Sequence, residues 1–126
     1  MKRFFGIFPK PAPMQETARV YDLKARLDWG EPALTIIDIR ERDLFNERHV
    51  LGAISLPMEE LIERIQVTLE CARDLYIYAS TDEEATTAAD ALRAVGYQKV
   101  SVLRGGVAAW KAAGFQTEAG ALSVAL

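Results

Sequence analysis

Cysteine and histidine are almost absent from this chain of 126 residues, which has one of each, Cys71 and His49. A single cysteine excludes an intrachain disulfide, which favours a reducing compartment, so a cytoplasmic location is expected. One thiol and one imidazole do not make a Cys/His metal cluster. We therefore expect no metal site and no cofactor.

An excess of positive charge and a long hydrophobic run are also missing. The 15 basic and 18 acidic residues give a net charge of -3, whereas phosphate-backbone binding needs a basic surface. The apolar start of the chain is interrupted by Pro9, Pro11 and Pro13. It is too short for a signal-peptide core of about 7 to 15 residues or a membrane span of about 20. We expect neither a nucleic-acid partner nor a transmembrane segment.

The remaining composition fits one globular domain, because half of the residues are apolar and supply a core. Proline at the start and apolar residues at the end set off two tails. We predict an N-terminal Pro-rich tail over residues 1–17, a compact domain over 18–118 and a C-terminal apolar tail over 119–126.

Short β-branched runs alternate with amphipathic segments along the compact part. The predicted strands cover residues 33–39, 53–55, 75–78 and 100–103, and the predicted helices cover 21–29, 41–47, 58–69, 86–95 and 107–113. This alternation predicts an α/β fold with a mostly parallel central sheet of about five strands and helices on both faces. Ligands of such folds bind at the carboxyl ends of strands, which points to Asp38, to the loop after Tyr78 and to the turn after Leu103.

Three stretches in this order carry motif residues: 37–41, 49–57 and 103–110. The residues concerned are Asp38, Arg40, His49, Gly52, Arg104, Gly105, Gly106 and Trp110. With the strand and helix around residues 78–79, they resemble the rhodanese-like domain family of sulfurtransferases over about 100 residues. Two departures are visible, since Leu51 replaces a usual proline and Arg104 replaces what is often an acidic residue.

Several of these residues also have a purely structural interpretation. Gly105 and Gly106 allow a sharp turn from strand to helix, and Trp110 gives that helix a large apolar anchor. For His49 we predict a turn-stabilising hydrogen bond, because no strong nucleophile is evident beside it.

The resemblance implies that an active member carries a cysteine after the strand that ends at Tyr78, where sulfur is held as a persulfide, and commonly an arginine five residues later. Here these positions hold Ala79 and Glu84. Alanine has no lone pair to attack sulfur, and Ser80 or Thr81 lacks an adjacent base. The resemblance therefore implies a catalytically silent loop with no catalytic residue.

The loop is also acidic. It comprises Ala79, Ser80, Thr81, Asp82, Glu83, Glu84 and Ala85. The three carboxylates belong in the first turn of the following helix, where the macrodipole favours negative charge. Thr81 with Glu84, and Ser80 with Glu83, have the spacing of a capping box. Such a turn repels an anionic substrate and attracts a cationic surface.

Three functional hypotheses stay open. The first is a silent rhodanese-like module that binds or regulates a protein partner. The second is a sulfurtransferase-type enzyme that uses Cys71 or a partner's thiol, although we expect Cys71 to be a buried or half-buried apolar residue away from the crevice. The third is an oligomeric scaffold, a homo-oligomer included, that acts through its apolar tails.

Overall fold

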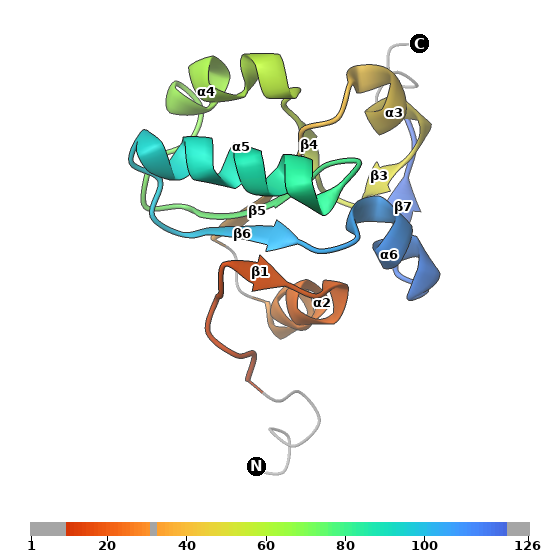
Figure 1. Ribbon diagram of the computed structural model, residues 1–126. Helices are drawn as coiled ribbons and strands as arrows, with labels where there is room; N and C mark the ends of the chain where they lie inside the picture. Colours follow the sequence, from red (N-terminus) through yellow and green to blue (C-terminus); the bar gives the residue numbers. More distant parts are fainter. Residues whose placement is uncertain (1–9, 31–32, 121–126) are drawn as a thin grey trace.

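The computed structural model describes residues 10–30 and 33–120, and within them the chain forms a five-stranded parallel sheet with helices on both faces (Figure 1). The strand order is β1-β6-β5-β2-β4. The strands are β1 (Thr17–Ala18), β2 (Leu34–Asp38), β4 (Ile54–Ser55), β5 (Asp74–Tyr78) and β6 (Val100–Leu103). The predicted α/β class and sheet are confirmed.

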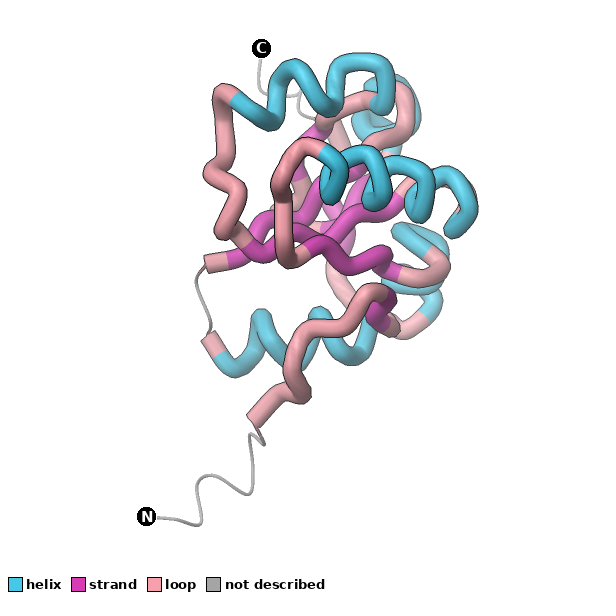
Figure 2. Tube along the Cα trace, turned by 60° about the vertical axis from the view of Figure 1, so that its left-hand side comes forward, coloured by secondary structure: helices cyan, strands magenta, loops and turns pink. Residues whose placement is uncertain are grey.

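The helices lie in two layers, with α4 and α5 over one face of the sheet and α2 over the other (Figures 1 and 2). Their bounds are α2 (Val20–Trp29), α3 (Arg42–Glu47), α4 (Met58–Gln66), α5 (Asp82–Ala94) and α6 (Gly106–Ala112). Strand β5 supplies both cores, because Ile77 packs with α4 and α5 whereas Tyr76 and Tyr78 pack with α2 and α6. Burial on both faces explains why this strand is an almost continuous apolar run.

Three short strands were not predicted. β1 pairs with β6 at the edge of the main sheet, and β3 (His49–Val50) pairs antiparallel with β7 (Thr117–Glu118). Two residues are too few to show a period in sequence, so tertiary contacts alone define these strands. The predicted 58–69 helix ends earlier, at Gln66, because Thr68 and Leu69 both donate backbone hydrogen bonds to Ile65 in a closing turn.

The two glycines at the junction of β6 and α6 make the predicted sharp turn. Gly105 and Gly106 have φ values of 79° and 53°, in the left-handed region that favours glycine. A Cβ on Gly106 would lie 3.1 Å from the carbonyl oxygen of Ala79, so this turn packs closely against the loop after β5. Trp110 anchors α6 in the core, and its indole N–H donates to the Gln116 carbonyl at 2.7 Å.

Residues 10–15 form neither helix nor strand, as their prolines predict. None of the helices in the described ranges is long and apolar enough to cross a membrane. Most of the predicted C-terminal tail, residues 121–126, and the start of the N-terminal tail, residues 1–9, lie outside the described residues.

Candidate functional site

The loop after β5 is short, with helix α5 beginning three residues beyond Ala79. Thr81 is the N-cap, and its hydroxyl accepts a hydrogen bond from the Glu84 N–H at 3.1 Å. This is one half of the predicted capping box. Within the described residues, neither predicted pair forms the reciprocal bond from its glutamate side chain. The Glu84 carboxylate is therefore not folded back onto the start of its own helix.

Asp82 connects this loop to the neighbouring turn. Its Oδ1 atom accepts the backbone N–H of Gly105 at 2.9 Å, across 23 positions of sequence. The first carboxylate of the acidic turn thus holds the β5–α5 and β6–α6 connections together. Arg104, which precedes that glycine, is exposed and bonds through its backbone N–H to Ala18.

A cavity of about 520 Å³ opens beside this loop at the carboxyl end of the sheet, as the topology predicted. We call it the carboxyl-end crevice. Its apolar residues are Ile39, Leu44, Met58 and Ala79. Its carboxylates are Glu41, Glu59 and Glu84, and Arg40, Ser80 and Thr87 complete the lining. Glu83 and Ala85 are not part of this lining. Glu83 is exposed to solvent, and Ala85 is buried in the core.

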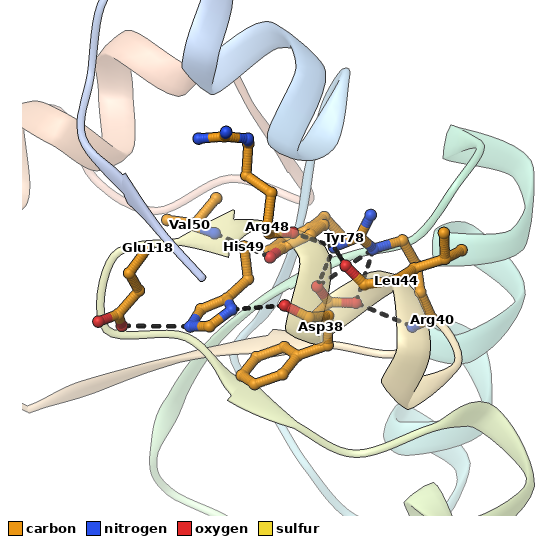
Figure 3. Close-up of polar contacts among 9 residues, drawn as sticks. Asp38, Arg40, Leu44, Arg48, His49, Val50, Tyr78 and Glu118 are labelled. Carbon is orange, nitrogen blue, oxygen red and sulfur yellow. Dashed lines mark hydrogen bonds and ion pairs between the residues drawn. The ribbon is translucent and has the colours of Figure 1, made fainter. Parts of the chain in front are cut away.

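Arg40 is the cation of the crevice, and Asp38 neutralises it (Figure 3). Asp38 is fully buried at the end of β2 and accepts the Arg40 Nη2 hydrogen at 2.6 Å and its Nε hydrogen at 3.0 Å. The same guanidinium donates to the carbonyls of Leu44 and Arg48 at 3.4 and 2.7 Å. Burial opposes the charge of Arg40, but hydrogen bonding and attraction from Asp38 prevail and raise its pKa. Arg40 therefore fixes helix α3, which forms one wall of the crevice.

Tyr78 lies under this pair, with the Arg40 guanidinium 5.5 Å from the centre of its ring. Its hydroxyl accepts the backbone N–H of Val50 at 3.0 Å (Figure 3). Burial raises the pKa of Tyr78 far above its usual range, and the negative charge of Asp38 raises it further. Tyr78 is thus a neutral, structural side chain at ordinary pH.

His49 forms the predicted hydrogen bond (Figure 3) and does not line the crevice. Its Nδ1 donates to the Phe45 carbonyl at 2.7 Å, and its ring stacks on that of Phe45 with centroids 3.7 Å apart. Its Nε2 faces Glu118 at 3.2 Å. Glu118 also accepts the N–H of Gly52 at 3.1 Å. The two motif residues His49 and Gly52 thus meet at β7 and hold the small antiparallel pair in place.

The predicted site residues therefore divide into two groups. Those that line the crevice are Arg40, Ala79, Ser80 and Glu84. The other predicted site residues do not line the crevice. Sequence reasoning missed the walls from α3 and α4, namely Glu41, Leu44, Met58 and Glu59. The sequence did hold a signal for them, because these residues lie within six positions after the ends of β2 and β4 and so belong to the same edge of the sheet.

The prediction for Cys71 was wrong about burial, since this residue is exposed. It lies in the turn between α4 and β5, near Gly96, and such connections run over the surface. That turn precedes β5, so Cys71 is at the opposite end of the strand from Ala79. Among the described residues no three His, Cys, Asp or Glu side chains gather in a way that could hold a metal ion.

The sequence pattern of the rhodanese-like domain matches residues 19–113 of this chain. The chain belongs to the rhodanese-like domain family. A crystal structure of the Alr3790 protein from Anabaena sp. has the same fold, with a TM-score of 0.80 and 45% identity over 82% of this chain and 81% of that one. This rhodanese-like domain is therefore close to a solved relative in both sequence and architecture.

Curated relatives match at lower identity. The uncharacterized protein YqhL of Bacillus subtilis is 31% identical over 75 residues, which cover 60% of this chain and 59% of that protein. The thiosulfate sulfurtransferase PspE of Escherichia coli is 31% identical over 65 residues, covering 51% of this chain and 62% of PspE. The rhodanese-like chain thus spans about three fifths of the length of these two relatives.

Proposed function

We propose that this rhodanese-like domain is catalytically silent at the loop after β5 and acts as a binding or regulatory module. The observation that carries the proposal is Ala79, a residue with a methyl side chain directly after β5 that lines the carboxyl-end crevice. A persulfide needs a thiolate, and alanine supplies none.

The charges and hydrogen bonds of the loop support the same proposal. The Glu84 carboxylate lines the crevice, where it repels anionic sulfur donors. The amide of Glu84 is occupied by the Thr81 hydroxyl, so the start of α5 offers fewer free N–H donors to an anion. Arg40, the cation in the lining, is already bonded to Asp38. An anionic substrate would thus meet neither a nucleophile nor an unpaired positive charge there.

The test is a thiosulfate:cyanide assay on the pure chain and on Cys71→Ser, with intact-mass analysis after sulfur-donor treatment. We expect no turnover and no bound sulfur in the Cys71→Ser chain, because that variant has no thiol. Turnover that survives this substitution would refute the proposal. A known thiosulfate sulfurtransferase assayed in parallel confirms that the conditions support the reaction.

One observation favours a second candidate, a sulfurtransferase that uses Cys71. Cys71 is exposed, as a residue that meets sulfur donors and acceptors needs to be. Its place at the amino end of β5 weighs against it, because the start of α5 follows the opposite end of that strand and, among the described elements, no other helix begins beside Cys71 to stabilise a thiolate. Turnover in the unmodified chain that disappears in Cys71→Ser would favour this candidate.

A further inference from the structure

Two of the apolar residues that line the carboxyl-end crevice are exposed. Leu44 of α3 and Met58 of α4 keep 38% and 40% of their surface accessible. Ile39 and Ala79, behind them, are almost completely buried and belong to the main core. The crevice therefore has a continuous apolar floor whose outer edges come from two different helices, and covering it removes apolar surface from water.

The charges around this floor are unbalanced. Glu41, Glu59 and Glu84 form no hydrogen bond or salt bridge through their carboxylates with any described residue. Arg40, the lining's cation, adds no net charge because it is paired with Asp38 at 2.6 Å. Three carboxylates around one cavity thus have no direct ion-pair partner among the described residues, and they make the lining of the crevice negative.

Glu60 follows Glu59 on α4 and does not line the crevice, and its carboxylate does have direct partners. Glu60 bonds to Arg42 at 2.9 Å and to Arg64 at 3.2 Å. The hydrogen bonds from Arg42, and secondarily those from Arg64, lower its pKa. Arg42 of α3 and Arg64 of α4 are therefore paired directly with Glu60, which does not line the crevice, whereas Glu59 interacts with Arg42 only through space.

We infer that the carboxyl-end crevice binds an arginine or lysine side chain of a partner protein. Such a side chain has an apolar stem, which fits Leu44 and Met58, and a cationic tip, which fits the three carboxylates. The inference rests on the proposed binding function and names its ligand. A cavity of about 520 Å³ lies in the range that holds drug-sized ligands, so residues flanking the basic side chain also find space.

The probe is an acetylated and amidated pentapeptide of sequence Gly-Leu-Arg-Leu-Gly, titrated into the full isotope-labelled chain while backbone amide shifts are recorded by NMR. The control peptide carries citrulline, an uncharged analogue, in place of arginine. Two protein variants test the site, Glu84→Gln in the crevice and Glu83→Gln one residue away on the same helical turn. Both remove one charge, and only the first changes the lining.

We expect shifts at residues 39–44, 58–59 and 79–87, with the citrulline peptide clearly weaker. Glu84→Gln should weaken binding about two- to fivefold, the range of one partly exposed ion pair, and Glu83→Gln should leave it unchanged. Added salt should weaken the arginine peptide more than its citrulline counterpart.

Equal binding of the two peptides, shifts that map elsewhere, or no binding at all would overturn the inference. Butylguanidinium that binds as tightly as the peptide would also overturn it, because the ligand would then be a small cation. The sulfur assay separates this result from the proposed function. If the chain neither binds the peptide nor takes up sulfur, only the assignment of the ligand is refuted. If Cys71→Ser shows turnover, the proposal of a silent loop is refuted whatever the titration shows.

Discussion

The pairing of Asp38 with Arg40 leads to the most quantitative prediction. The substitution Asp38→Asn keeps the shape of the side chain but removes the charge that neutralises a guanidinium whose side chain is 10% exposed. Breaking a buried pair in this way costs about 3 to 5 kcal/mol, because the remaining charge is left uncompensated. Arg40 keeps its bonds to the carbonyls of Leu44 and Arg48, so the lower end of that range, about 3 kcal/mol, is expected.

The assay is chemical denaturation at neutral pH, with the free energy of unfolding obtained by linear extrapolation. For a domain of this size the loss corresponds to a drop in melting temperature of about 10 °C. Asp43→Asn is the matched control, since Asp43 is exposed in α3 and its loss should cost less than about 1 kcal/mol through the helix dipole.

Combining Asp38→Asn with Arg40→Met separates the charge from the packing. The double variant should be more stable than Asp38→Asn alone, because no unpaired guanidinium remains. A loss below about 1 kcal/mol for Asp38→Asn, or no recovery in the double variant, would refute the argument that the pair holds α3 in place.

Two further predictions concern the loop and the strand before it. Ala79→Cys should form little persulfide after thiosulfate treatment, whereas Ala79→Cys with Glu84→Arg should form more, because the cation favours the thiolate and the anionic donor. Equal mass spectra for the two variants would remove the electrostatic part of the explanation. Tyr78→Phe should destabilise the domain by about 1 to 3 kcal/mol at pH 7, because the N–H of Val50 loses its acceptor. The raised pKa of Tyr78 means that the unfolded chain ionises first, so the unmodified domain should lose stability above pH 10.0, the ordinary value, and Tyr78→Phe should lose less over the same interval. Parallel unfolding curves for both proteins from neutral to alkaline pH would contradict this.

The regular elements could be predicted because their signals are local. The apolar run of β5 and the capping residue Thr81 each act within a few positions of sequence. The same is true of the glycine turn at Gly105 and Gly106, whose backbone conformation few other residues adopt. The strands β1, β3 and β7 could not be found in this way, because their pairing partners lie far along the chain.

The candidate site was predictable only in part. Strand ends pointed to Asp38 and to the loop after Tyr78, both of which the structure places at the crevice or directly behind it. Which carboxylates stay unpaired was not predictable, because Glu59 and Glu60 are adjacent and chemically identical. Their difference comes from the helix that each one faces, since Glu60 meets Arg42 of α3 and Glu59 lines the cavity.

The sequence by itself determined that the loop after β5 has no thiol, that its helix starts with three acidic residues, and that the fold is a parallel α/β sheet. These are matters of residue identity and local period. Only the tertiary structure decided that the Asp82 carboxylate accepts the N–H of Gly105 and that Arg40 is paired with Asp38. It also decided that Glu84 lines an open cavity. The physical reason is that a charge acts through the partners packed against it, and those partners come from parts of the chain that only folding brings together.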